Sequence, residues 1–230
     1  MQRNGAADII KEENVSADLL VNISEIPLWG RLWAVDGGGR SVRQDFSATK
    51  TEELGKLFPV LLAAHDPLWK KRFEKETAFL QTVFGNAAAR ISHIGSTAVE
   101  GLIAKPTIDI LLELYDDIDL PAITERMLDF GYVINAPPND LIMFLKGYTP
   151  RGFSGQAFHI HVRKNGDWDE LYFRDYLIAN PETADEYAAL KISLKEIFPN
   201  DRNGYTAAKG EFVKKYTQLA RAEFGGRYQP

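Results

Sequence analysis

Apolar and polar positions form regular patterns from residue 49 to the end of the chain, and the period of the pattern changes along the way. Apolar side chains at helical spacing occupy residues 65–85, with Asp66 placed to cap the helix start and Gly85 to end it. Alternating or continuous apolar runs between turn residues predict strands. We therefore predict helices over 47–62, 65–85 and 121–131, and strands over 90–94, 107–115, 132–134, 141–148 and 157–164.

Beyond Gly166 the pattern is helical to the end of the chain, with Pro or Asn-Gly between the segments. It predicts helices over 167–180, 181–198 and 205–225, and a glycine-rich loop at 149–156 joins the last two strands. These elements predict an α+β fold, in which a mixed sheet is flanked by helices and closed by a C-terminal helical segment at about 167–224.

Residues 1–48 differ from the rest of the chain. The apolar run at 19–35 alternates partly like a strand or hairpin and stops before three consecutive glycines at 37–39. These glycines suit a turn or a flexible connection, and they are not a P-loop because no Gly-Lys-Ser/Thr follows. We interpret residues 1–48 as an N-terminal extension whose order the sequence does not predict, and residues 49–230 as the main domain.

Composition and charge narrow the possible functions. The 230 residues are 45% hydrophobic and 26% charged, and the lack of cysteine excludes disulfides, thiolate zinc sites and cysteine nucleophiles. The formal net charge of −5 gives no basic footprint for nucleic acid. No opening segment resembles a signal peptide, and no apolar run approaches the roughly 18 residues of a membrane span. We expect a cytoplasmic protein without a membrane partner.

The stretch HIGSTAVEGLIAKPTIDILLEL, residues 93–114, contains the strongest candidate chemistry. The bend Gly95-Ser96-Thr97 follows a predicted strand, where backbone N–H groups and two hydroxyls suit a phosphate. Lys105 would add a cation, and Asp109 interrupts an apolar strand. The alternative is a structural turn whose hydroxyls are satisfied locally, followed by a carboxylate that only makes hydrogen bonds.

This stretch resembles the signature of the GrpB family, and the resemblance extends over roughly residues 49–224. The family is assigned to the DNA-polymerase-β-like nucleotidyltransferase superfamily. The resemblance implies a palm-like sheet in which Gly95 and Ser96 match the phosphate-binding Gly-Ser element and Asp109 matches the first metal-binding carboxylate. Active members of the superfamily usually carry a second acid two positions on, where this chain has Leu111. Glu113 lies roughly 13 Å farther along the strand and is too distant to share an ion.

Two histidines are candidates to complete the site. His159 and His161 project from one face of the strand at 157–164, and His93 precedes the Gly-Ser bend. A cluster of these histidines around Asp109 would suit a transition metal better than Mg²⁺. The alternative is a pair of histidines on a solvated sheet face.

Two residues of the helix at 167–180 are further candidates. Glu170 could supply the missing carboxylate to the metal, and Arg174 could grip a phosphate, or the two could form an ordinary surface ion pair. Lys146 and Arg151, around the loop at 149–156, could face an anionic substrate as a lid, or flank a plain hairpin loop.

The function predicted from these residues is metal-dependent nucleotidyl transfer from a nucleoside triphosphate, or related chemistry on another phosphate-bearing small molecule, to an unknown acceptor. Asp109 would hold Mg²⁺ or Mn²⁺, Ser96 and neighbouring amides the triphosphate, and Lys105 or Arg174 the charge that develops on phosphate. The alternative is a nucleotide-binding module that kept the fold without transferase activity, which Leu111 favours.

Overall fold

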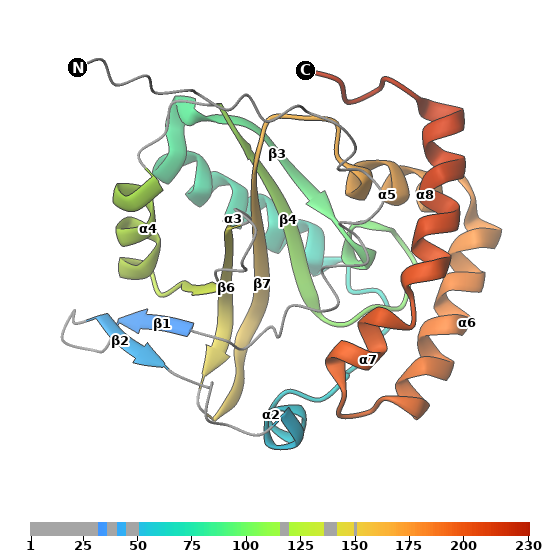
Figure 1. Ribbon diagram of the computed structural model, residues 1–230, viewed down its shortest axis with the longest axis horizontal. Coiled ribbons are helices and arrows are strands. Elements are labelled where there is room, and N and C mark those ends of the chain that lie inside the picture. Colours follow the sequence, from blue (N-terminus) through green and yellow to red (C-terminus); the bar gives the residue numbers. More distant parts are fainter. Residues whose placement is uncertain (1–31, 36–40, 45–50, 116–119, 136–141, 150) are drawn as a thin grey trace, which may run out of the picture.

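The computed structural model describes residues 32–35, 41–44, 51–115, 120–135, 142–149 and 151–230. Its centre is a five-stranded sheet in the order β3-β4-β7-β6-β5 (Figure 1). The β4–β7 pair is parallel and the other three pairs are antiparallel, so the sheet is mixed as predicted. The strands are β3 (Ala88–Ile94), β4 (Thr107–Leu114), β5 (Val133–Asn135), β6 (Ile142–Thr149) and β7 (Gly152–Lys164).

One face of the sheet forms the main core against α3 (Leu68–Phe84) and α4 (Leu120–Asp129). The α3 helix begins where Asp66 Oδ1 accepts a hydrogen bond from the backbone N–H of Leu68, and it ends at Gly85, whose φ is +53°. Alternate residues of β4 and β7 point into this core and exclude water from it: Ile108, Ile110, Leu112, Phe158, Ile160 and Val162.

Four helices gather beside the β3 edge of the sheet (Figure 1). They are α5 (Asp169–Ala179), α6 (Pro181–Ile197), α7 (Arg202–Ala207) and α8 (Gly210–Phe224). The helical prediction for this part of the chain is confirmed, but the single helix expected over 205–225 is wrong. Asp201 caps α7 by accepting a hydrogen bond from the N–H of Gly204. The helix is interrupted after Ala207, and α8 begins after Lys209.

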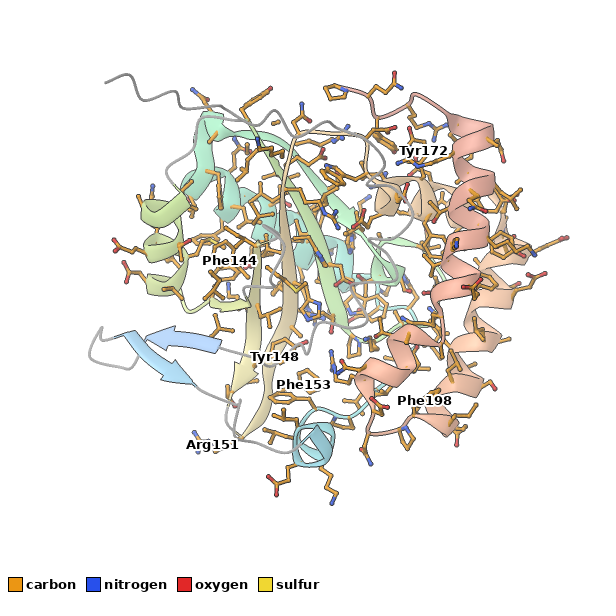
Figure 2. The ribbon with its side chains drawn as sticks, in the orientation of Figure 1. Phe144, Tyr148, Arg151, Phe153, Tyr172 and Phe198 are labelled. Atoms are coloured by element: carbon orange, nitrogen blue, oxygen red, sulfur yellow. The ribbon has the colours of Figure 1, made fainter. Side chains whose placement is uncertain are left out.

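The β6–β7 connection is much tighter than the predicted loop at 149–156. Thr149 pairs directly with Gly152, so β7 begins inside the segment that the sequence assigned to a loop. A register shift lies between Lys146 and Tyr148, where Gly147 has a φ of +85°. This bulge matters because an extra residue reverses which face the following side chains occupy. Figure 2 shows Tyr148 and Phe153 on the two strands near this hairpin.

The first half of the chain is partly described. Strands β1 (Leu32–Val35) and β2 (Ser41–Gln44) pair antiparallel as a separate two-stranded sheet, which agrees with a hairpin in this region. The glycines at 37–39 and the rest of the predicted extension lie outside the described residues. The helix expected over 47–62 is shorter, since α2 spans Thr51–Leu57 and Pro59 follows it. Among the described helices, none has both the length and the apolar character needed to cross a membrane.

Candidate functional site

Asp109 of β4 lies against two histidines of the neighbouring strand β7. Its Oδ1 is 3.1 Å from Nδ1 of His159 and 3.6 Å from Nε2 of His161. One ligand atom from each of the three residues lies within 4.8 Å of the others. The parallel register explains this convergence, because Asp109 pairs with His159 and Leu111 with His161, which places all of them on one sheet face.

The bend after β3 is closed tightly over Asp109. Gly95 has a φ of +69°, and a Cβ atom added there would lie 2.6 Å from Oδ2 of Asp109. Only glycine leaves room for the carboxylate in this backbone conformation. The structure therefore places the Gly-Ser bend next to the carboxylate of Asp109, as the sequence predicted.

Tyr148 supports His159 from the other side. Its hydroxyl lies 2.7 Å from His159 Nε2, and Nη2 of Arg202 donates to the same hydroxyl at 3.3 Å. Without the bulge at Gly147, the alternation of β6 would turn Tyr148 to the α3 face, where Lys146 pairs with Glu76. The bulge therefore supplies a hydrogen bond that orients the imidazole of His159.

The charges of the cluster follow from burial and mutual contact. Burial opposes ionisation of Asp109, but hydrogen bonds from His159 and His161 outweigh it and hold the pKa of the carboxyl well below its usual range. Burial lowers the pKa of His159, while the hydrogen bond to Asp109 acts in the opposite direction. An ionised carboxylate beside a neutral imidazole is the protonation state in which both groups donate electron pairs to a metal ion.

Ser96 points to a second polar cluster. Its Oγ lies 3.1 Å from Nζ of Lys191 on α6, and the same ammonium donates to the carbonyl oxygen of Ile103. Lys191 is only 2% exposed and pairs with no carboxylate among the described residues. Burial lowers the pKa of Lys191 to about 7, and nearby Lys209 contributes to this shift.

Further cations surround the ring of Tyr205. The Nζ atoms of Lys105 and Lys209 lie 5.3 and 4.7 Å from its centroid. Burial and the charge of Arg202 lower the pKa of Lys105, while burial lowers that of Lys209 to about 8 against an opposing effect of Asp109. The Tyr205 hydroxyl is buried and has no hydrogen-bond partner in the described part of the chain. Like charges that gather around a buried ring, beside a hydroxyl with no partner among the described residues, favour an anionic ligand.

Three predicted site residues have other partners. The Thr97 hydroxyl is buried, donates to the carbonyl of Thr107 and contacts His93. Glu170 does not join the cluster of possible metal ligands, because its carboxylate pairs with Arg163. Arg174 donates to Asp175, to Tyr228 and to the backbone carbonyl of His93.

His93, which the sequence suggested as a third histidine of the cluster, is on the wrong face of the sheet. It pairs with Ile110 rather than with Asp109, and its ring stacks on Phe73 of α3 at 4.6 Å. Burial lowers its pKa to about 4. Of the two alternatives for Lys146 and Arg151, a lid or a plain hairpin, the described residues agree with the hairpin. Lys146 pairs with Glu76, and Arg151 lies in the tight β6–β7 connection.

Leu111 and Glu113, which share a face of β4 with Asp109, stabilise the fold. Leu111 is fully buried and packs with Ile94 and Leu171, so no second carboxylate stands beside Asp109 at that position. Glu113 is also fully buried, but it binds Arg90 through both oxygens and accepts from the N–H of Gly166. The prediction that Glu113 cannot share an ion with Asp109 agrees with this pairing.

Sequence reasoning missed the residues contributed by the C-terminal helices and by the bulge: Tyr148, Lys191, Arg202, Tyr205 and Lys209. One signal was present in the sequence. The buried positions of α6 are Ala184, Tyr187, Lys191 and Leu194, so a lysine occupies the apolar stripe of a helix. A lysine is almost never fully buried without a partner, and its place in that stripe marks it as a functional candidate.

The fold and the site define an α+β protein with a five-stranded mixed sheet, in which a possible Asp-His-His metal cluster lies beside buried cations. The model of the GrpB protein family matches residues 59–219, and the chain belongs to this family. The family membership predicted from the signature at 93–114 is thereby confirmed.

Relatives and a solved structure agree with this membership. The glutamate-rich protein GrpB of Alkalihalophilus pseudofirmus is 37% identical over 160 residues, covering 67% of this chain and 91% of that protein. A UPF0157 protein of Pseudomonas aeruginosa is also 37% identical over 160 residues, covering 68% of this chain and 66% of that protein. The crystal structure of the conserved protein GrpB from Enterococcus faecalis aligns with a TM-score of 0.64 at 26% identity, over 71% of this chain and 99% of that chain. None of these three names states an activity.

Proposed function

We propose that the protein is a metal-dependent enzyme that transfers a nucleotidyl group from a nucleoside triphosphate to an acceptor. The observation that carries this proposal is the convergence of Asp109, His159 and His161 directly beneath the Gly95–Ser96 bend. A metal site and a phosphate-binding bend in contact are the two parts that phosphoryl-group chemistry needs, because such chemistry depends mainly on positioning and charge stabilisation.

The donor set fits a divalent ion with a preference for nitrogen as well as oxygen ligands. One carboxylate and two imidazoles suit Mn²⁺ or Zn²⁺ better than Mg²⁺, which favours oxygen donors and retains water. The buried Nδ1 of His161 has no hydrogen-bond partner in the described residues, so this imidazole is not fully used by the protein. A bound ion would supply positive charge to the phosphoryl oxygens of the substrate.

Three lysines would hold the phosphates. Lys191 and the Ser96 hydroxyl form one contact pair, and Lys105 and Lys209 lie around the Tyr205 ring. Ammonium groups forced together without carboxylate partners are costly, and a polyanion would offset that cost. The role expected for Arg174 in binding phosphate passes to Lys191 in this proposal, because Arg174 is paired with Asp175.

The second candidate function is a nucleotide- or phosphate-binding module without transferase activity. Leu111 favours it, since a single carboxylate beside two histidines gives fewer anionic ligands than the paired acids of active nucleotidyltransferases. This candidate uses the same anion site and differs only in the lack of turnover.

Two measurements test the proposal. The first is the thermal stability of the wild-type protein and of the variants Lys191→Met and Lys195→Met with nucleoside triphosphates, each with and without Mn²⁺. A ligand at 100 times its Kd stabilises by about 2.7 kcal/mol, and we expect this stabilisation to be lost in Lys191→Met and kept in Lys195→Met. Equal stabilisation of all three proteins would contradict the assigned phosphate site.

The second measurement is release of pyrophosphate from nucleoside triphosphates in the presence of candidate acceptors. Pyrophosphate that depends on Asp109 supports the transferase, and binding with no release over a broad acceptor panel supports the binding module.

A further inference from the structure

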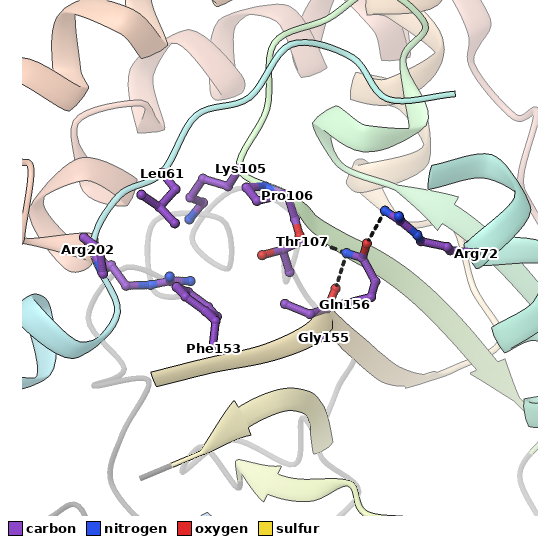
Figure 3. A pocket seen from close by; sticks show the side chains of 11 residues that line it. Leu61, Arg72, Lys105, Pro106, Thr107, Phe153, Gly155, Gln156 and Arg202 are labelled. Atoms are coloured by element: carbon purple, nitrogen blue, oxygen red, sulfur yellow. Dashed lines mark hydrogen bonds between the residues drawn. The ribbon is translucent and has the colours of Figure 1, made fainter. Parts of the chain in front are cut away.

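A pocket of about 260 Å³ opens between residues 59–61 and the adjoining ends of β4 and β7. Apolar walls come from Pro59, Leu61, Pro106 and Phe153 (Figure 3). The volume is slightly below the roughly 300–1,000 Å³ of pockets for drug-sized ligands, so it suits a smaller molecule. The four apolar residues belong neither to the candidate metal cluster nor to the phosphate site.

The polar lining of this pocket is entirely positive or neutral. Arg72, Lys105 and Arg202 contribute cations, Thr107 and Gln156 contribute neutral groups, and the described lining contains no acidic residue. Figure 3 shows the ends of Lys105 and Arg202 pointing toward the space bounded by Leu61 and Phe153. Two cations directed at an apolar cavity match a ligand that has one anionic group and an apolar body.

Arg72 has a different role from the other two cations. Its Nη1 donates to Oε1 of Gln156 at 2.8 Å and to Oδ2 of Asp66 at 3.2 Å. The amide of Gln156 donates in turn to the carbonyls of Pro106 and Ala157. Arg72 therefore fixes the pocket wall while Asp66 balances its charge, whereas Lys105 and Arg202 direct their charged ends at the cavity (Figure 3).

Arg202 also connects the pocket to the candidate metal cluster. Its guanidinium carbon lies 5.6 Å from the centroid of Phe153, so it lies over a ring that lines the pocket. The same side chain donates to the Tyr148 hydroxyl, which lies 2.7 Å from His159. Arg202 itself is thus two hydrogen bonds away from His159, and a ligand held by Arg202 would be one contact farther.

We propose that this pocket binds a small organic acid, in which a carboxylate contacts Lys105 and Arg202 and an aromatic or branched apolar body packs between Leu61 and Phe153. The binding site stands on this pocket, which shares Lys105 with the phosphate site proposed above. Its further role, as the place of the second substrate, rests on the proposed transferase function. The apolar walls do not suit a sugar, which needs many hydrogen bonds. The cations of the lining would repel a polyamine.

The test uses benzoate as the probe and benzyl alcohol as its neutral counterpart, with binding followed by calorimetry on the full-length protein. We expect benzoate to bind and benzyl alcohol to bind at least tenfold more weakly. Lys105→Met should weaken benzoate binding by roughly tenfold or more, because one charge-assisted contact is lost. Leu61→Asp, at a residue that is 47% exposed, should exclude benzoate by charge repulsion without unfolding the protein.

Asp109→Asn separates this proposal from the proposed function. Benzoate binding that survives Asp109→Asn supports an independent organic-acid pocket even if metal and nucleotide binding fail. Equal binding of benzoate and benzyl alcohol, or benzoate binding unchanged in both Lys105→Met and Leu61→Asp, would overturn the pocket assignment. Displacement of benzoate by a nucleoside triphosphate without metal would overturn it as well, because the pocket would then belong to the nucleotide.

Discussion

At the scale of single residues, two positions near Asp109 shape the candidate site because their side chains are absent or apolar. Gly95 has no side chain where a Cβ would meet the carboxylate of Asp109, and Leu111 has no carboxylate where a second acid would stand. The first feature lets the bend approach Asp109, a ligand of the proposed metal site, closely. The second means that, in the proposed metal site, the histidines of β7 would complete the ligand set.

Gly95→Ala should damage the metal cluster in addition to straining the backbone. The added Cβ would lie 2.6 Å from Asp109 Oδ2, so the carboxylate must move away from the histidines. We expect metal binding to weaken by at least about tenfold, with a loss of roughly 1–3 kcal/mol in the free energy of unfolding. Mn²⁺ calorimetry and urea denaturation measure the two effects.

Gly101→Ala is the matched control for this prediction. Gly101 also has a positive φ, of +79°, but a Cβ there meets nothing within 4 Å. It should lose stability and keep metal affinity. Equal metal binding by Gly95→Ala and Gly101→Ala would show that the close approach to Asp109 is unimportant.

The candidate residues that the structure brings together share a physical reason. Asp109, His159 and His161 stand in strands whose alternation fixes the face of each side chain, and Gly95 ends a strand in the same sheet. The local sequence pattern is enough to predict the face that such side chains occupy. The partners of Glu170 and Arg174 could not be predicted, because a helical pattern shows which residues share a side but not what that side contacts. In the structure these partners are Arg163, Asp175 and Tyr228.

At the scale of elements, the β6–β7 hairpin decides how the cluster is supported. The bulge at Gly147 turns Tyr148 onto the face that carries His159. The sequence predicted both strands but not the bulge, because a glycine near the end of a predicted strand does not show whether the register shifts there. The hydrogen bond from Tyr148 to the cluster could not be predicted for the same reason.

Gly147→Ala should disturb the bulge and, through it, the metal cluster. A Cβ there would lie 2.6 Å from the carbonyl oxygen of Gln156 and 2.9 Å from Cα of Ala157, so backbone must move. We expect a loss of about 2–4 kcal/mol in unfolding free energy and a roughly tenfold weaker metal affinity once Tyr148 no longer orients His159. Urea denaturation and Mn²⁺ calorimetry measure the two losses.

Gly155→Ala provides the comparison for the hairpin. Gly155 lies in β7 with a φ of +69°, and a Cβ atom added there would meet no other atom within 4 Å. The substitution should cost only about 1–2 kcal/mol and leave metal affinity unchanged. If both variants lose the same stability and neither loses affinity, the bulge has no part in the site.

At the scale of the whole molecule, the C-terminal helices bring positive charge to the sheet. Lys191 comes from α6, Arg202 from α7 and Lys209 from the junction before α8. Their meeting depends on how four helices pack, which local periodicity does not determine. The architecture was therefore predictable from the sequence, while the meeting of Lys191, Arg202 and Lys209 was not.

These lysines should make stability depend on pH. The pKa of Lys191 is lowered from 10.5 to about 7 on folding, so the unfolded chain binds more protons between those values and stability should rise with pH across that window. In Lys191→Met the rise should be smaller by up to about 1.4 kcal/mol per pH unit, the equivalent of one proton. Lys195→Met should keep the wild-type slope.

Urea denaturation at several pH values from about 7 to about 10 measures this dependence in the three proteins. An unchanged slope in Lys191→Met would mean that Lys191 keeps its proton in the folded state, contrary to the burial described above.

The central claim is that Asp109, His159 and His161 form a metal site. Its most direct test is calorimetric titration of Mn²⁺ into the wild-type protein, Asp109→Asn and, as a control, Asp129→Asn at an exposed position of α4. We predict one bound ion in the wild type and in Asp129→Asn, with an affinity at least about tenfold lower in Asp109→Asn because its amide carries no charge. Equal Mn²⁺ affinity in all three proteins, or no binding by the wild type, would contradict the claim.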